Sequence, residues 1–511
     1  MLYLISSCIA LLLGPIFYRF FATNNGLHKG LDGFIFVSLG GLVLVHILPE
    51  LLEHGGLLAI FFVLLGLWGP TASEKIFHKY SEITHNLTLV LGIGGLLLHT
   101  LTDGGAMVLA QQEHNSNLLA LGVILHRLPV GVAIWWLLKP QVGTRWASAV
   151  IASMMVLTAI GYFAGEQWLT QLSLDNTAYL QAFVTGSILH VVVHQPHGQP
   201  DTGDSGRFKY QAGVGSLLGL GLLFVLLMMD SGGHEHHHHE SSYEHLIDWM
   251  LTIAPVLLLS YGIAAIRFHF GQSPTTSSRR SLWLQRLCGP EALVISLVLL
   301  GPIFALTQTA SLLMIGTILT LTKAMPTDPH LDTPSSPIRF GFAHLIDRSA
   351  PWVLLSLILA NLIGHPSVPL ANPYAQVAIL LMVFLPMRFC NLGAAVLAVA
   401  LAYSGWEPIA VFLPLIAAPW LNIKQLKLLS PLQAIAAIAA LLVSLYVANM
   451  WIGHWQTLFA FPSFIQVVSL SILAILFALS LLRLGPRDFL GKLMVIRGKP
   501  HDHHHDHGHH H

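Results

Sequence analysis

Residues 87–110 read LTLVLGIGGLLLHTLTDGGAMVLA, an apolar segment of about the length that crosses a bilayer, and it contains one histidine and one aspartate. His99 and Asp103 are four residues apart, so on a helix they lie on one face, one turn apart. An ionisable group at the bilayer centre costs about 3 kcal/mol on insertion scales, which makes it a candidate for function. A neutral imidazole and a carboxylate in this arrangement can bind one metal ion together.

The composition of the whole chain places most of it in lipid. Of 511 residues, 54% are hydrophobic and 9% are charged, and the mean hydropathy is +0.68. Soluble domains carry roughly 25% charged residues, so this chain has too few charges to solvate a globular surface of its size. We therefore predict an all-α polytopic membrane protein. The net charge of zero argues against a nucleic-acid partner, and three scattered cysteines argue against a disulfide scaffold.

Apolar stretches predict about 17 transmembrane helices. Eight lie in the first half, at residues 1–20, 31–52, 56–71, 87–110, 117–138, 146–165, 177–195 and 211–229. Nine lie in the second half, at residues 246–266, 288–304, 306–322, 349–364, 373–387, 391–404, 408–421, 431–450 and 464–483. The first stretch lacks a basic leading region and a small-residue cleavage site, so we expect it to be retained as a span.

Lysines and arginines predict the orientation of these spans. In the first half, loops that contain or adjoin them, as with Lys75 and Lys79 or Lys139 and Arg145, alternate with loops that contain none. The positive-inside rule then puts the N-terminus outside and the C-terminal tail in the cytoplasm. We expect the protein in the inner (cytoplasmic) membrane of the cell.

Histidine is over-represented, with 30 residues against 24 lysines and arginines. Much of the excess lies in residues 231–244, a predicted extracytoplasmic linker between two domains, and in residues 491–511, the predicted cytoplasmic tail. Imidazole is the commonest metal ligand in proteins, so the tracts are expected to collect and buffer metal ions. The alternative is a solubilising segment of low complexity.

A third predicted metal ligand lies in the next span. His126 is followed three residues later by Pro129, which frees a backbone carbonyl within the span. His99, Asp103 and His126 form a set of two nitrogens and one oxygen suited to zinc. Two further pairs, each four residues apart, extend a conduction route on either side: His46 with Glu50 and His190 with His194. For each, hydrogen-bonded packing is the alternative interpretation.

The same motifs resemble the ZIP (zinc/iron permease) family over about residues 1–230. The second span contains His46-Ile47-Leu48-Pro49-Glu50, similar to the family's HLLPEA. The fourth contains His99-Thr100-Leu101-Thr102-Asp103-Gly104, and the fifth contains His126-Arg127-Leu128-Pro129-Val130-Gly131, similar to H-x-x-P-E-G. The resemblance implies an eight-helix ZIP-like metal transport domain with both ends outside.

Two departures from the family pattern affect the expected site. Val130 stands where the family has a glutamate that bridges metal ions, and Arg127 brings a positive charge where a second metal would sit. At about 4 Å in low dielectric, the repulsion between two cations is large. We therefore expect a single ion in the central site, and a sensor or scaffold is the alternative to a transporter.

The second half, residues 245–490, contains an internal repeat. The tetrapeptide HLID occurs at His245–Asp248 and His344–Asp347, and Arg286-Leu287-Cys288 parallels Arg388-Phe389-Cys390. The two copies cover residues 245–324 and 344–425. Short, proline-interrupted spans at corresponding positions are typical of transporters that build a site between repeats. A duplication without present function is the alternative.

Residues Leu385–Asn422 resemble the ArsP-like predicted permeases, through Pro386, Cys390, Gly393, Ser404-Gly405, Pro408 and Pro419. Members of that family are linked to export of trivalent organoarsenicals through thiol ligands. The resemblance implies that Cys288 and Cys390 form a possible substrate site in a repeat-built permease domain.

Three functions follow as hypotheses. The first is a transporter of divalent metal ions, with Zn²⁺ as substrate and the lipid bilayer as its surroundings. The second is an exporter of metal or metalloid species through the second half, with the first half regulatory. The third and most remote is an intramembrane metalloenzyme, since the His/Asp set could activate water; we do not expect an enzyme or a prosthetic group. No Walker motif is present, and a homodimer is possible.

Overall fold

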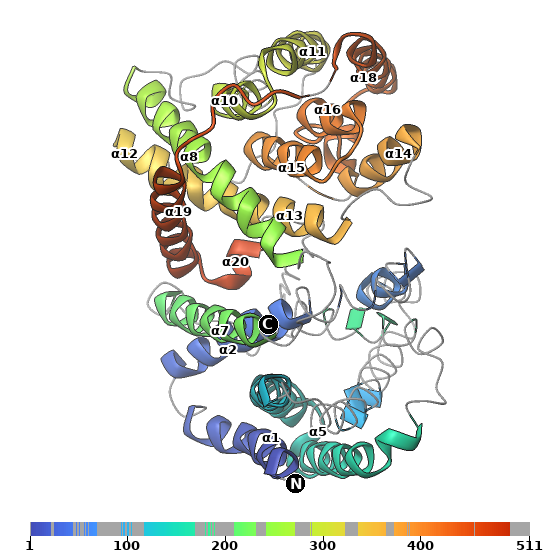
Figure 1. The fold of residues 1–511 in the computed structure, drawn as a ribbon, viewed down its shortest axis with the longest axis vertical. Helices are drawn as coiled ribbons and strands as arrows, with labels where there is room; N and C mark the ends of the chain where they lie inside the picture. Colours follow the sequence, from blue (N-terminus) through green and yellow to red (C-terminus); the bar gives the residue numbers. More distant parts are fainter. Residues whose placement is uncertain are drawn as a thin grey trace, which may run out of the picture. The chain divides into compact units, whose positions relative to one another are not determined.

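The computed structural model describes residues 2–21, 25–43, 117–168, 209–230, 242–270, 289–321, 336–363, 372–385, 389–453 and 455–490. It also describes residue 387 and scattered residues within 48–104, 179–189 and at 287. All helices mentioned below belong to this part of the chain (Figure 1). The chain divides into two compact units: residues 1–241 with 481–487, and residues 242–480 with 488–511.

The protein is an integral, polytopic membrane protein built from α-helices. Seven helical segments in the described part of the chain are long and apolar enough to cross a membrane. They are α1 (Leu2–Phe21), the second part of α5 (Val142–Ala164), α8 (Ser242–His269), α11 (Pro302–Thr320), α12 with α13 (Pro337–Asn361), α18 (Pro431–Trp451) and α19 (Ser463–Leu484). The prediction of about 17 transmembrane helices is not supported, because seven helical segments in the described part of the chain are long and apolar enough to cross a membrane.

The difference lies partly in short helices that were predicted as full spans. They are α10 (Pro290–Leu299), α14 (Pro373–Phe384), α15 (Asn391–Tyr403) and α16 (Pro408–Ala417). A helix rises 1.5 Å per residue, so a 10-residue helix such as α10 covers about 15 Å, half of the ~30 Å hydrocarbon core. Proline at the first position explains where α10, α14 and α16 begin. Hydropathy extended the predicted stretches 288–304, 373–387 and 408–421 past the ends of α10, α14 and α16, whereas the predicted stretch 391–404 agrees with α15.

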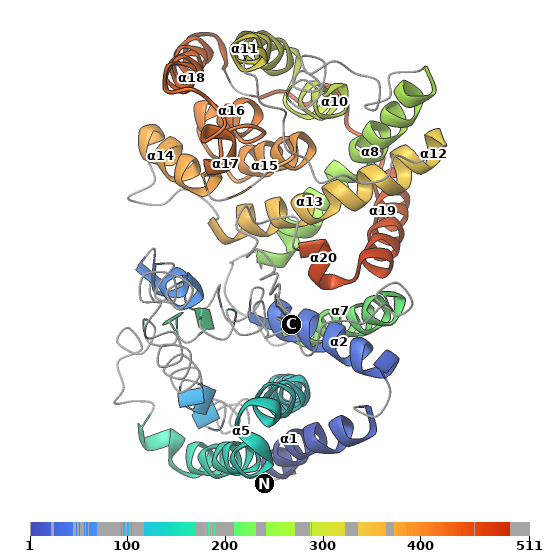
Figure 2. The ribbon, with the colours of Figure 1, turned by 180° about the vertical axis from the view of Figure 1, so that it is seen from behind.

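The first unit contains two helix pairs, α1 with α5 (Asn117–Trp168) and α2 (Asn25–Leu42) with α7 (Lys209–Asp230) (Figures 1 and 2). Glycines allow both pairs to pack closely. A Cβ on Gly14 of α1 would collide with the backbone of Gly131 in α5, and a Cβ on Gly215 of α7 would collide with Gly30 of α2. Helices in lipid associate through such small residues, because apolar side chains gain nothing by leaving lipid.

Helix α5 contains a break at Gly143, where φ is 82° and ψ is 172°. Only glycine adopts this conformation without strain. The sequence predicted two spans here, 117–138 and 146–165, and the break falls between them. The chain therefore changes direction at Gly143, between the two parts of α5.

Residues 481–487, from the end of α19 into α20 (Pro486–Leu490), belong to the first unit. Arg487 donates two hydrogen bonds to Asp32, Nε to Oδ2 at 3.0 Å and Nη2 to Oδ1 at 2.9 Å. Its guanidinium also lies 5.3 Å from the ring centre of Phe36. Both arms of the Arg487 fork are thus occupied by one carboxylate.

The second unit is organised around α15, which packs against α13 (Leu345–Ile363), α16 and α10 (Figure 2). Every residue of α15 from Leu392 to Ala402 is buried. A π-helical turn, η4 (Phe340–His344), leads into α13 and brings Gly341 against the backbone of α8. The Tyr261 hydroxyl of α8 and the Ser349 hydroxyl of α13 are 2.8 Å apart and hydrogen-bonded.

Substituting Gly14→Ala is expected to destabilise the first unit by about 1–3 kcal/mol, because the added methyl group meets backbone that cannot move aside. The matched control is Gly40→Ala in α2, where a Cβ meets nothing within 4 Å. That control is expected to be neutral or to gain up to about 1 kcal/mol in helix propensity. Thermal unfolding of the two variants in detergent measures the difference, and equal midpoints would contradict the close packing.

Candidate functional site

Most of the predicted metal ligands lie outside the described residues. This holds for His46, Glu50, His99, Asp103, His190 and His194. His126 lies in α5, but its side chain is not among those described. Within the described residues there is no group of three or more His, Cys, Asp or Glu that could hold a metal ion. The metal site remains a prediction.

The structure does describe residues that directly follow the predicted ligands in the sequence, and these residues lie close together. Arg127 follows His126, and its Nη2 donates to the backbone carbonyl of Thr100, which follows His99, at 3.3 Å. Its Nη1 donates to the hydroxyl of Thr158, in the second part of α5, at 2.6 Å. Gly104, which follows Asp103, packs so closely on Thr158 and Tyr162 that a Cβ would collide with their backbone. Three segments of the first unit thus converge around Arg127.

Arg127 is a buried cation in this cluster, with 1% of its surface exposed. A guanidinium stays protonated in proteins, so the positive charge is permanent. Two of its hydrogen bonds go to neutral oxygens, the Thr100 carbonyl and the Thr158 hydroxyl. Arg127 therefore places a positive charge inside this cluster.

Thr158 was missed in the sequence analysis. Its hydroxyl accepts from Arg127 and donates to the carbonyl of Met154 at 2.8 Å. A threonine in an apolar span is a weak signal, because its hydroxyl can always bond to its own helix. The partner 31 residues away becomes visible only in the folded chain.

Val130 lies in the apolar core of the first unit, together with Leu11, Ile134 and Met154. It is 7% exposed. Gly131 beside it has no space for a Cβ, because α1 passes at Leu11. Val130 therefore packs among apolar side chains of the first unit.

Of the two cysteines predicted for the second unit, Cys288 lies outside the described residues and Cys390 is described. Cys390 is the N-cap of α15, and its Sγ accepts a hydrogen bond from the backbone N–H of Gly393 at 3.2 Å. It is partly buried and forms no disulfide. The thiol thus serves to cap a helix.

The helices α10 and α15 meet near their N-terminal ends. A Cβ on Gly289, the N-cap of α10, would collide with Nδ2 of Asn391 and lie 2.8 Å from Oε2 of Glu291. Nη2 of Arg267, in the last turn of α8, forms an ion pair with Oε1 of Glu291 at 2.8 Å. We call Arg267, Gly289, Glu291, Cys390 and Asn391 the helix junction.

The helices α10 and α15 are also similar at their C-terminal ends. Each ends before a glycine with positive φ, Gly301 at 106° and Gly405 at 78°. Each is followed by a helix with proline at its first position, Pro302 in α11 and Pro408 in α16. Sequence reasoning missed Arg267, Glu291 and Asn391, although a glutamate within the predicted span 288–304 was a visible signal.

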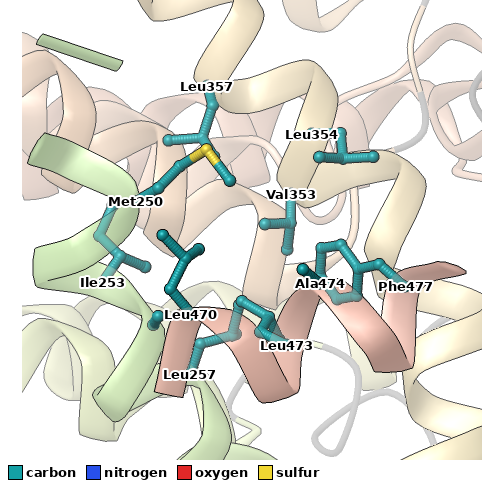
Figure 3. A pocket seen from close by; sticks show the side chains of 11 residues that line it. Met250, Ile253, Leu257, Val353, Leu354, Leu357, Leu470, Leu473, Ala474 and Phe477 are labelled. Atoms are coloured by element: carbon teal, nitrogen blue, oxygen red, sulfur yellow. The ribbon is translucent and has the colours of Figure 1, made fainter. Parts of the chain in front are cut away.

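An apolar pocket lies between α8, α13 and α19 in the second unit (Figure 3). It has about 350 Å³ of space not filled by protein atoms and is lined by hydrophobic side chains such as Met250, Leu354 and Phe477. Because the lining offers no ligand for a cation or an anion, we do not assign the transport chemistry to this pocket.

No protein-family model, no curated protein and no solved structure matches this chain. The family resemblances therefore rest on the sequence motifs alone.

Replacing Thr158→Val is expected to lower the free energy of unfolding by about 1–3 kcal/mol, because a buried guanidinium loses an acceptor that the isosteric valine cannot replace. Thr307→Val in α11 is the control, since that exposed hydroxyl bonds to the Ile303 carbonyl of its own helix. Chemical unfolding in detergent compares the variants. Equal losses would show that the bond to Arg127 contributes nothing measurable.

Proposed function

We propose that this membrane protein carries divalent metal ions, with zinc as the main substrate, across the bilayer. The proposed ligands are His99, Asp103 and His126. The observation that carries the proposal is the hydrogen bond from Arg127 to the Thr100 carbonyl, because it joins the residues that directly follow His126 and His99. Gly104, packed on Thr158, supports the same convergence for the segment that contains Asp103.

In this proposal each group of residues has a separate role. The imidazoles of His99 and His126 supply nitrogen ligands, and the Asp103 carboxylate balances part of the ion's charge. Arg127 limits the site to one ion by its fixed charge. His46 with Glu50 and His190 with His194 would pass the ion to and from this site, and the His-rich segments 231–244 and 491–511 would concentrate ions at either end. With the N-terminus outside, the pairs lie on opposite sides of the site.

The test is zinc flux in proteoliposomes that contain the full-length chain. The variants His99→Ala and Asp103→Ala are expected to reduce the zinc flux at least about tenfold. Loss of a residue that only hydrogen-bonds to a metal ligand already has an effect of that size, and these variants remove a proposed ligand itself. The control is His269→Ala, which removes an exposed histidine of α8 in the second unit. Radioactive zinc measures the flux, and unchanged flux in both test variants would rule out the central site.

A second candidate function is export of a metal or metalloid species by the second unit. It is favoured by the parallel construction of α10 and α15, since paired discontinuous helices are how many transporters form a binding site. In this case Cys390→Ser would abolish transport of the cargo, while His99→Ala would only change its regulation by metal. The two variants in the same flux assay therefore separate the two candidates.

A further inference from the structure

The second unit contains a buried ion pair whose geometry is incomplete. Arg267 uses Nη2 to bind Oε1 of Glu291, while its Nε is buried and has no hydrogen-bond acceptor among the described residues. An unsatisfied buried donor lowers the stability of a protein, and a charged donor lowers it more. A buried donor without an acceptor needs an explanation, and a role in binding a ligand is one such explanation.

Arg487 in the first unit shows what a complete pair looks like in the same chain. Its Nε and Nη2, the same two donors, each bond to one oxygen of Asp32, at 3.0 and 2.9 Å. The fork of a guanidinium fits a carboxylate or phosphate in this bidentate way. Compared with Arg487, Arg267 has an ion-pair contact at one of these two donors, while its Nε and the facing Oε1 of Glu291 both lack a hydrogen bond among the described residues.

Glu291 cannot fill both positions while it holds its place in the junction. Its second oxygen, Oε2, lies against Gly289, within 2.8 Å of where a Cβ would stand, and the Asn391 amide packs on the same glycine. The carboxylate is therefore divided between Arg267 on one side and the start of α10 on the other. The Nε of Arg267 is left for an oxygen from another molecule.

The surroundings favour a negatively charged ligand. The junction lies at the N-terminal ends of α10 and α15, where helix dipoles are positive. Arg267, Cys390 and Asn391 each keep part of their surface exposed, while the Nε atom of Arg267 itself is buried.

We propose that the helix junction of the second unit binds a small oxyanion, which places one oxygen on Nε of Arg267 and competes with Glu291 for Nη2. Glu291 would hold the guanidinium in position when the site is empty. The discontinuous helices α10 and α15 would place this anion between the two copies of the internal repeat. The ligand class is any small carboxylate, phosphate or sulfate, since all present two oxygens to the fork.

The experiment measures equilibrium binding of radiolabelled phosphate, sulfate and acetate, in separate arms, to the full-length protein in detergent and chloride buffer. At least one anion is expected to bind saturably to the wild type. Arg267→Gln is expected to weaken that binding about 10- to 100-fold, the value of a charge-assisted hydrogen bond. Glu291→Gln is expected to strengthen it several-fold, because the competing carboxylate is gone. Arg487→Gln, the matched control, is expected to bind as the wild type does.

Three results would overturn the proposal: no saturable binding of any of the three anions, equal binding by Arg267→Gln and wild type, or no gain in Glu291→Gln. If Arg267→Gln does not fold, the Glu291→Gln variant decides alone, because a merely structural ion pair gives no reason for anion binding to rise. The three arms also show whether the ligand is a carboxylate, a phosphate or a sulfate.

Discussion

The structure depends on one constraint: within a bilayer every backbone N–H and C=O must find its partner inside the protein. Continuous helices such as α18 and α19 meet this requirement alone. Discontinuous helices do not, and their ends need help from other groups. The Cys390 thiol and the Asn372 side chain each accept a backbone N–H at the start of a helix. Some polar side chains of the second unit are therefore used where the chain stops being helical.

Close backbone contact is the second consequence of the same environment. Since lipid is as apolar as leucine, helices gain little from burying large side chains against each other, and dense packing has to supply the attraction. In the first unit Gly14 meets Gly131, and Gly30 meets Gly215. In the second unit Gly289 lets α10 and α15 approach at the junction. Glycine thus allows the closest approaches between these helices.

The sequence predicted the helical membrane class and several long spans, because hydropathy over about 20 residues is a strong signal. It placed the division between α15 and α16 correctly, with predicted stretches at 391–404 and 408–421, but it carried the stretches 288–304 and 408–421 past the ends of α10 and α16. For the site, His99 and Asp103 stood out because charge in a span is rare, and they remain predictions. Thr158 and Glu291 could not be paired with their arginines, since the pairing is made by folding and leaves no spacing pattern in the chain.

Three arginines show how differently one type of charge can be satisfied in this protein. Arg487 donates to Asp32 through both Nε and Nη2, which makes a bidentate ion pair. Both side chains are a quarter or more exposed. Arg127 is fully buried and donates to two neutral oxygens. Arg267 forms an ion pair with Glu291 through Nη2, and its buried Nε has no hydrogen-bond acceptor among the described residues. A buried permanent charge attracts or repels mobile ions near it. In the two proposals above, Arg127 would therefore limit how many cations the first unit accepts, and Arg267 would give the second unit its preference for an anion.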